Sequence, residues 1–174
     1  MSNAVPRANV NDKKLLTVSG LSTLTRIATP TDREAVNSLH ARCSPTSRYD
    51  RYQAPRTQIS EAEWRVLTDP ERGTSWVTHP ADAPHHAIAV TNMMHTDHEG
   101  VVELGVLVDD VWQCQGLGRG LASHAVTKAS RLGHRSIEVH ALTSNIRTLR
   151  ICRSLGGRTL RTSGATVEIV VPVP

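Results

Sequence analysis

The chain lacks phenylalanine altogether, and its 174 residues include only three tryptophans and two tyrosines. Aliphatic side chains must therefore build the hydrophobic core, and the length suits one domain of ordinary size. No apolar run approaches the roughly 18 residues of a membrane span, and the N-terminus has no basic segment followed by an apolar one. We therefore expect a cytoplasmic protein with no membrane partner.

Cysteine is also scarce, and its spacing argues against two common roles. Cys43, Cys114 and Cys152 are an odd number and contain no C-x-x-C pair, so we expect neither a disulfide framework nor a cysteine zinc site. The nine histidines include no H-x-x-x-H pair on a predicted helix. The expectation is therefore three free thiols and no metal.

The charge balance is basic but not concentrated. The formal net charge is +4 and the sequence pI is about 9.3, which suits an anionic ligand or partner. The basic residues are scattered along the chain and lack the interleaved aromatics of a nucleic-acid platform. We therefore expect no nucleic-acid partner.

The order of predicted elements indicates a mixed α/β domain. Residues 1–20 are polar and lack sustained periodicity, so a flexible tail is expected there, followed by one domain at 21–174. The domain then reads as strand, two helices, three strands, helix, strand, helix and two closing strands.

Capping signals predict where the first helices begin. Thr31 and Glu34 form a T-x-x-E capping box before a helix that extends to about residue 42, and Ser60 and Glu63 repeat the pattern before a short second helix. The intervening segment, 43–58, contains two prolines and is interpreted as a loop or a broken helix.

A glycine-rich stretch, WQCQGLGRG at 112–120, separates a predicted strand from a predicted helix. This arrangement favours phosphate binding, because free N–H groups and the helix dipole attract an anion that glycines allow to approach. The nucleotide P-loop requires a Lys-Ser/Thr pair that is missing here. The dinucleotide fingerprint fits poorly too, because its third small residue would fall on Leu121. A tight turn without a ligand is the structural alternative.

Within this stretch, QCQGLG at 113–118 matches Q/R-x-x-G-x-G/A, the acetyl-CoA signature of the GNAT superfamily of N-acetyltransferases. The chain resembles this superfamily from about residue 22 to 173. The resemblance implies a central, mostly antiparallel twisted sheet of about six to seven strands flanked by about four helices, with acetyl-CoA as co-substrate. The residues that it assigns to acetyl-CoA are Val106, Leu107, Val108, Gln113, Cys114, Gln115, Gly116, Leu117, Gly118, Arg119 and Asn145.

Glu103 is the predicted catalytic base. It is the only carboxylate of the strand VVELGVLV, and related bacterial protein-lysine acetyltransferases place a glutamate at this position. The alternative is an edge-strand glutamate that faces water. Gly105 is the candidate for the strand bulge that admits the cofactor in this superfamily. Cys152 stands where many members have a tyrosine acid, which leaves the general acid unassigned.

The acceptor is less well defined than the cofactor. The segment CSPTSRYDRYQ at 43–53 is similar to one in bacterial protein acetyltransferases, which implies a protein lysine as acceptor. Two alternatives remain: a small-molecule N-acetyltransferase for an aminoglycoside, polyamine or amino acid, and a GNAT-fold module that binds acyl-CoA without catalysis. The apolar last strand, VEIVVPV, either pairs in a homodimer or fills its own sheet.

Overall fold

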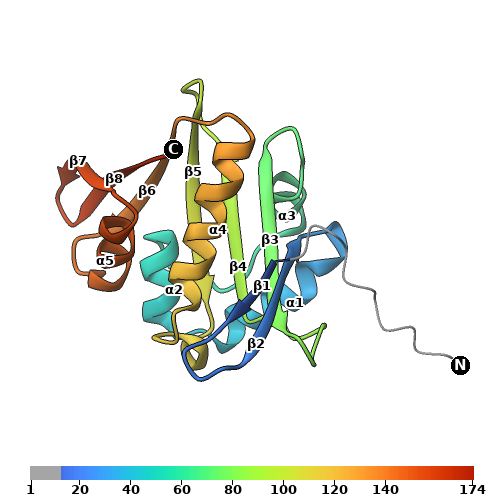
Figure 1. The fold of residues 1–174 in the computed structure, drawn as a ribbon. Coiled ribbons are helices and arrows are strands. Elements are labelled where there is room, and N and C mark those ends of the chain that lie inside the picture. The colour runs from blue at the N-terminus through green and yellow to red at the C-terminus, as the bar shows by residue number, and fades with distance from the viewer. Residues whose placement is uncertain (1–12) are drawn as a thin grey trace, which may run out of the picture.

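A twisted sheet of eight strands organises the computed structural model, which describes residues 13–174 (Figure 1). The strands are β1 (Lys13–Leu16), β2 (Ser22–Ile27), β3 (Gly73–Pro80), β4 (Ala89–His95), β5 (Val101–Val108), β6 (Ser136–Leu142), β7 (Arg158–Ser163) and β8 (Thr166–Pro172). The sheet order is β1-β2-β3-β4-β5-β6-β8-β7. All neighbours are antiparallel except β5 and β6, which run parallel. The expected mixed α/β architecture is thus confirmed, with slightly more elements than predicted.

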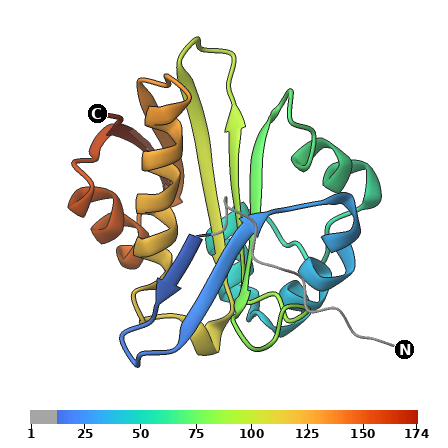
Figure 2. The ribbon, with the colours of Figure 1, turned by 45° about the vertical axis from the view of Figure 1, so that its right-hand side comes forward.

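Helices cover both faces of this sheet (Figure 2). The α-helices of the described residues are α1 (Arg33–Arg42), α2 (Pro45–Tyr52), α3 (Glu61–Leu67), α4 (Leu117–Arg131) and α5 (Ile146–Ser154), and short 3₁₀ turns η1 (Pro30–Asp32) and η2 (Asp110–Trp112) precede α1 and the glycine-rich loop. On one face, α4 and α5 share a core with β5, β6 and β8. On the other face, α1 and α3 pack with β3, β4 and β5.

Helix α4 forms because its small and aliphatic residues recur at helical spacing. The apolar stripe predicted from the sequence comprises Leu117, Leu121, Ala125, Ala129 and Leu132. The first four are buried, whereas Leu132, at the C-cap, is exposed. The helix ends before Gly133, whose φ of +79° is the left-handed conformation expected after a C-cap. The long helix therefore covers the sheet with its first turn held beside the end of β5.

The sequence did not predict one element and left a second undecided. Residues 13–16 of the expected tail form β1, which pairs with β2, while residues 1–12 of that tail lie outside the described residues. The segment interpreted as a loop or a broken helix contains α2, which begins at Pro45 with Ser44 as its N-cap. Proline suits the first helical position, because the N–H that it lacks would have no partner there.

The start of α1 also differs from the prediction. The capping box is formed by Thr29 and Asp32, whose carboxylate accepts the Thr29 N–H at 2.8 Å, and not by Thr31 and Glu34. Arg26 binds the same carboxylate through two nitrogens, which anchors this turn to β2. The box predicted at Ser60 and Glu63 is present.

Candidate active site

Strands β5 and β6 separate partway along their length and form a fork. Their parallel pairing ends at Glu103 and Glu138, whereas β5 continues to pair with β4 as far as Val108. The β6 side of β5 beyond Glu103 is therefore left without a strand partner. The predicted bulge at Gly105 is wrong, because β4 and β5 pair residue for residue through this position.

A cavity of about 390 Å³ lies in this fork. Of the residues predicted from the sequence, those that line the cavity are Glu103, Val106, Leu107, Val108, Gln113, Cys114, Gly116, Gly118, Arg119 and Asn145. Two others are placed elsewhere. Leu117 is buried in the core beneath α4, and the Gln115 side chain binds Ser19 and the Val111 carbonyl. The side chains of Leu117 and Gln115 therefore support the loop, and only the backbone of these two residues remains available to a ligand.

The glycine-rich loop closes one end of the cavity. Gly116 is the N-cap of α4 and has a φ of +82°, a conformation that glycine adopts without strain. The first N–H groups of α4 follow directly, and such groups have no carbonyl one turn earlier to bind. The cavity therefore meets a helix N-terminus with the partial positive charge that favours phosphate.

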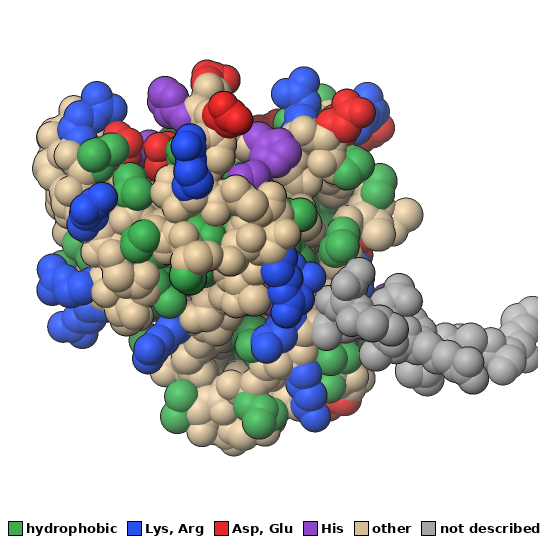
Figure 3. All heavy atoms as spheres, turned by 45° about the horizontal axis from the view of Figure 1, so that its top comes forward, with side chains coloured by type: hydrophobic (Ala, Val, Ile, Leu, Met, Phe, Trp, Pro, Cys, Tyr) green, Lys and Arg blue, Asp and Glu red, His purple; other side chains and the backbone are tan. Residues whose placement is uncertain are grey.

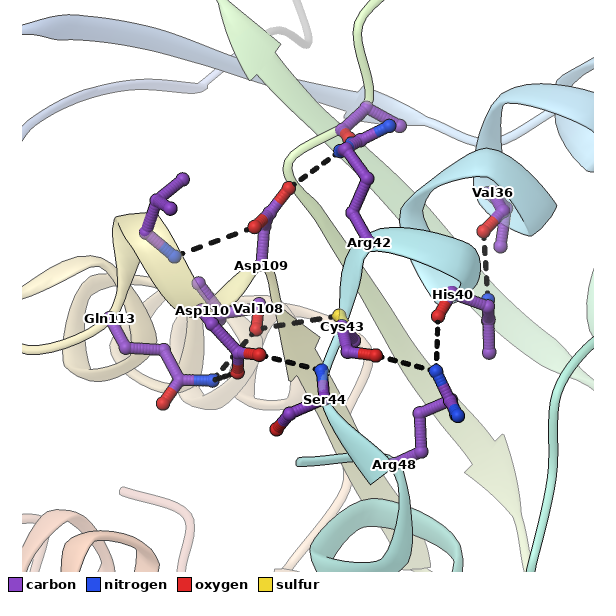
Figure 4. A network of polar contacts seen from close by, with 12 residues as sticks. Val36, His40, Arg42, Cys43, Ser44, Arg48, Val108, Asp109, Asp110 and Gln113 are labelled. Carbon is purple, nitrogen blue, oxygen red and sulfur yellow. Dashed lines mark hydrogen bonds and ion pairs between the residues drawn. The ribbon is translucent and has the colours of Figure 1, made fainter. Parts of the chain in front are cut away.

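Gln113 connects this loop to two helices, and Figure 4 shows its bonds to Val108 and Asp110. Its side-chain amide donates to the Val108 carbonyl at 3.0 Å, to the Asp110 carboxylate at 2.9 Å and to the Ser47 hydroxyl at 3.0 Å. Its carbonyl oxygen accepts from Arg147 of α5 at 2.5 Å. The glutamine of the signature thereby fixes the loop between α2 and α5.

Two adjacent aspartates complete the attachment of the loop to the first helices (Figure 4). Asp109 is buried and forms an ion pair with Arg42 at 2.7 Å. Burial raises the pKa of Asp110, but hydrogen bonds from the Ser47 hydroxyl and the Ser44 N–H outweigh burial and hold the pKa below its usual value. Asp110 therefore remains an anion that accepts from both serines.

Three arginines that sequence reasoning missed also line the cavity: Arg51, Arg147 and Arg150. Arg147 and Arg150 are three residues apart on α5, a spacing that places both on one side of a helix and could have been recognised. The side chain of Asn145 caps this helix by accepting the Thr148 N–H at 3.1 Å. Together with Arg119, the two α5 arginines make this end of the cavity strongly basic.

The other end of the cavity carries the predicted base and the unusual cysteine. Glu103 is exposed and lines the cavity from β5. Cys152 lines it from α5, is only 4% exposed, and also belongs to the α4-side core. Burial raises the pKa of the Cys152 thiol to about 11, so the thiol stays protonated at neutral pH.

Residues 13–174 contain neither a metal-binding group nor a membrane-spanning helix. No three or more His, Cys, Asp or Glu side chains there are grouped so that they could hold a metal ion. No helix in the described part of the chain is long and apolar enough to cross a membrane. Figure 3 shows lysine and arginine side chains spread over one face of the molecule rather than gathered into a single patch.

Solved structures similar to this one share its fold over nearly the whole chain. The GNAT domain of PAT from S. lividans is 20% identical, with a TM-score of 0.82 and coverage of 92% of this chain and 96% of that chain. The ribosomal-protein-S18-alanine N-acetyltransferase from Escherichia coli is 18% identical, with a TM-score of 0.68 and coverage of 87% and 94%. A cAMP-binding acyltransferase from Mycobacterium smegmatis is 22% identical with a TM-score of 0.65, and the match covers 94% of this chain but only 47% of that longer one.

No curated protein matches the chain. The family model for the acetyltransferase (GNAT) domain matches residues 23–158, which is most of the domain described above. This match spans the fork, the glycine-rich loop and α5. The chain therefore belongs to the GNAT acetyltransferase family.

Proposed function

We propose that the protein is an acetyl-CoA-dependent N-acetyltransferase that transfers the acetyl group to a primary amine by direct attack. One observation carries this proposal: a single cavity brings together the free side of β5, a glycine-rich helix N-terminus and the Glu103 carboxylate. A turn without a ligand needs none of these features around a cavity.

The residues present fit the chemistry of coenzyme A. The backbone of Val106, Leu107 and Val108 borders the cavity where β5 has no partner on its β6 side, so it can pair with the amide groups of the pantetheine arm. The N–H groups at the start of α4 suit the pyrophosphate, and Arg119, Arg147 and Arg150 add positive charge beside it. Cys114 and Asn145 lie on the border of the same space.

Glu103 is proposed to act as the general base. A lysine amine has an unperturbed pKa of about 10.4 and must lose a proton before its lone pair can attack the acetyl carbon. Glu103 takes this proton directly or through a water molecule. The new C–N bond then replaces the C–S bond, and the departing thiolate of coenzyme A takes up a proton.

A protein lysine is the proposed acceptor. The similarity of residues 43–53 to a segment of bacterial protein acetyltransferases supports this choice. In the structure, this segment contains α2, and its Ser47, Asp50 and Arg51 line the same cavity as Glu103. The acceptor amine is therefore expected to enter past α2.

Isothermal titration with acetyl-CoA, with NADH and ATP as controls, is the direct test of the proposed function. Selective binding of acetyl-CoA would support it, and a thiol-release assay on lysine peptides would then measure turnover. If none of the three ligands bound, the glycine-rich loop would be a turn only and the enzymatic proposal would fail. Binding without turnover on any amine would instead favour a non-catalytic acyl-CoA-binding module.

A further inference from the structure

The guanidinium of Arg51 lies directly against the backbone of β5 at Gly105. A side-chain carbon at position 105 would overlap the Cζ and Nη2 atoms of Arg51. Asn92, which pairs with Gly105 across β4 and β5, accepts from Nη2 of Arg51 at 3.2 Å. The glycine that was predicted to form a bulge therefore has a different role, which is to leave room for an arginine.

A buried network fixes the aromatic ring beside this arginine. His40 is fully buried and its Nδ1 lies 2.7 Å from the Val36 carbonyl, which can only accept a hydrogen bond, so Nδ1 carries the proton. Burial also lowers the pKa of His40 and favours the neutral ring. Nε2 of His40 consequently accepts from the Tyr52 hydroxyl at 2.7 Å. The Arg51 guanidinium lies 4.8 Å from the centre of the Tyr52 ring, which is cation–π distance.

The Glu103 carboxylate attracts the charge of Arg51 without forming a direct ion pair with it. No carboxylate of residues 13–174 forms an ion pair with it, and its Nε is buried without a hydrogen-bond partner. A buried donor without a partner is rare and costly, so its retention calls for an explanation. Arg51 is also among the residues that line the cavity. It is thus a rigidly held cation inside the candidate active site.

We infer that the acceptor carries a carboxylate near its reacting amine, and that Arg51 binds this carboxylate. This inference rests on the proposed function. Glu103 and Gly105 are two residues apart on β5 and so lie on the same face. An amine at Glu103 and a carboxylate at Arg51 can therefore belong to one molecule. The planar guanidinium matches a carboxylate in shape and charge.

This arrangement disfavours two of the small-molecule acceptors left open by the sequence. Aminoglycosides and polyamines carry several positive charges, and the half-buried Arg51 cation beside the base would repel them. The required chemistry can come from two sources: a free amino acid, or a protein lysine with an aspartate or glutamate next to it. Both present a carboxylate within a few bonds or one residue of the amine.

The test compares matched acceptors that differ only in charge. One arm uses the common amino acids and their carboxamides, and the other uses lysine peptides with aspartate or asparagine beside the lysine. We expect the wild-type protein to favour the carboxylate member of a pair by about tenfold or more in kcat/KM. The arm that shows this preference identifies the source of the carboxylate.

Arg51→Gln is expected to abolish this preference, and Arg51→Lys, which keeps the charge but not the planar fork, to restore only part of it. Arg56→Gln is the matched control, because Arg56 lies 4.7 Å from the same Tyr52 ring but forms an ion pair with Glu63. This control is expected to retain the preference. Thermal unfolding of each variant checks that it folds.

Specific outcomes would overturn the inference without affecting the proposed function. Equal kcat/KM for the two members of every pair would do so, as would acetylation of polyamines in preference to both arms. Arg51→Gln that slows all acceptors equally would place Arg51 at the acetyl group instead. If the wild-type protein did not bind acetyl-CoA, in contrast, the proposed function itself would be refuted.

Discussion

The backbone N–H of Val18 donates to the carbonyl oxygen of Gln115 at 2.9 Å, and this bond joins the turn between β1 and β2 to the glycine-rich loop. The Ser19 hydroxyl adds a second bond, to the Gln115 side chain, also at 2.9 Å. A segment expected to be a flexible tail therefore supports the loop that is proposed to hold the pyrophosphate.

Removing this N–H is predicted to weaken acetyl-CoA binding. One intramolecular hydrogen bond contributes about 0.5–1.5 kcal/mol, so Val18→Pro is expected to lower the affinity about two- to tenfold. Val18→Ala keeps the N–H and serves as the matched control. Isothermal titration of both variants with acetyl-CoA measures the difference, and equal affinities would show that the turn does not position the loop.

The three cysteines are predicted to differ sharply in reactivity. Burial raises the pKa of Cys43 to about 12 and that of Cys152 to about 11, so neither forms much thiolate near pH 8. Cys114 is exposed and borders the cavity. A chromogenic aromatic disulfide is therefore expected to label one thiol quickly in the native protein and all three in denaturant.

Cofactor protection gives this labelling experiment a second readout. Saturating acetyl-CoA is expected to slow the labelling of Cys114 at least several-fold, because the side chain borders the space assigned to the pyrophosphate. Cys114→Ser should remove the fast phase altogether. A labelling rate that acetyl-CoA leaves unchanged would contradict the placement of the pyrophosphate beside Cys114.

Local patterns predicted the elements whose residues carry their own signal. The apolar stripe of α4, the cap at Gly133 and the capping box at Ser60 all depend on neighbours within a few positions of the chain. By contrast, β1 is a four-residue edge strand that is ordered by pairing with β2, so no periodicity could reveal it. For α2, the two prolines of the segment left a loop and a broken helix both open, although Pro45 occupies the first helical turn.

The candidate site shows the same limit. The glycine-rich loop could be predicted from its motif, and Glu103 could be predicted from the alternating pattern of its strand. The contact between Arg51 and Gly105 could not be predicted, because it joins a helix and a strand that are far apart in the sequence. It depends on how α2 packs on the sheet. Gly105 itself was noticed, but a glycine that admits a bulge and one that admits a side chain look alike in sequence.

The buried His124 is predicted to make stability depend on pH. Burial lowers the pKa of His124 to about 4, and the nearby positive charges of Lys128, Lys13 and Arg131 lower it further. The ring packs edge-on against Trp76, and its Nε2 has no hydrogen-bond partner. The unfolded chain binds a proton below about pH 6.5, whereas the folded protein does so only near pH 4. The contribution of neutral His124 to the unfolding free energy is therefore fully present above pH 6.5 and is lost as the pH drops towards 4.

The contribution of His124 over this range is on the order of 3 kcal/mol. His124→Leu is expected to flatten the decline of the unfolding free energy, measured by urea denaturation at several pH values. His86→Leu removes an exposed histidine and should leave the slope unchanged. Identical slopes for the wild-type protein and His124→Leu would contradict the prediction.

Glu103→Gln is predicted to lower turnover by about 10²- to 10⁴-fold, the range expected when a general base is removed. Acetyl-CoA affinity should stay within about twofold, because the carboxylate lies at the acceptor end of the cavity. Glu138→Gln is the matched control: Glu138 pairs in register with Glu103 on β6 but is not among the residues that line the cavity.

The pH profile separates loss of a base from a structural defect. In Glu103→Gln, only the amine that is already neutral can react, so kcat/KM should rise tenfold per pH unit up to the amine pKa of about 10.4. The wild-type protein should show a shallower rise, because Glu103 supplies the missing deprotonation. If Glu103→Gln turned over as fast as the wild type, this residue would have no part in the mechanism. A water molecule in the cavity would then have to take the proton.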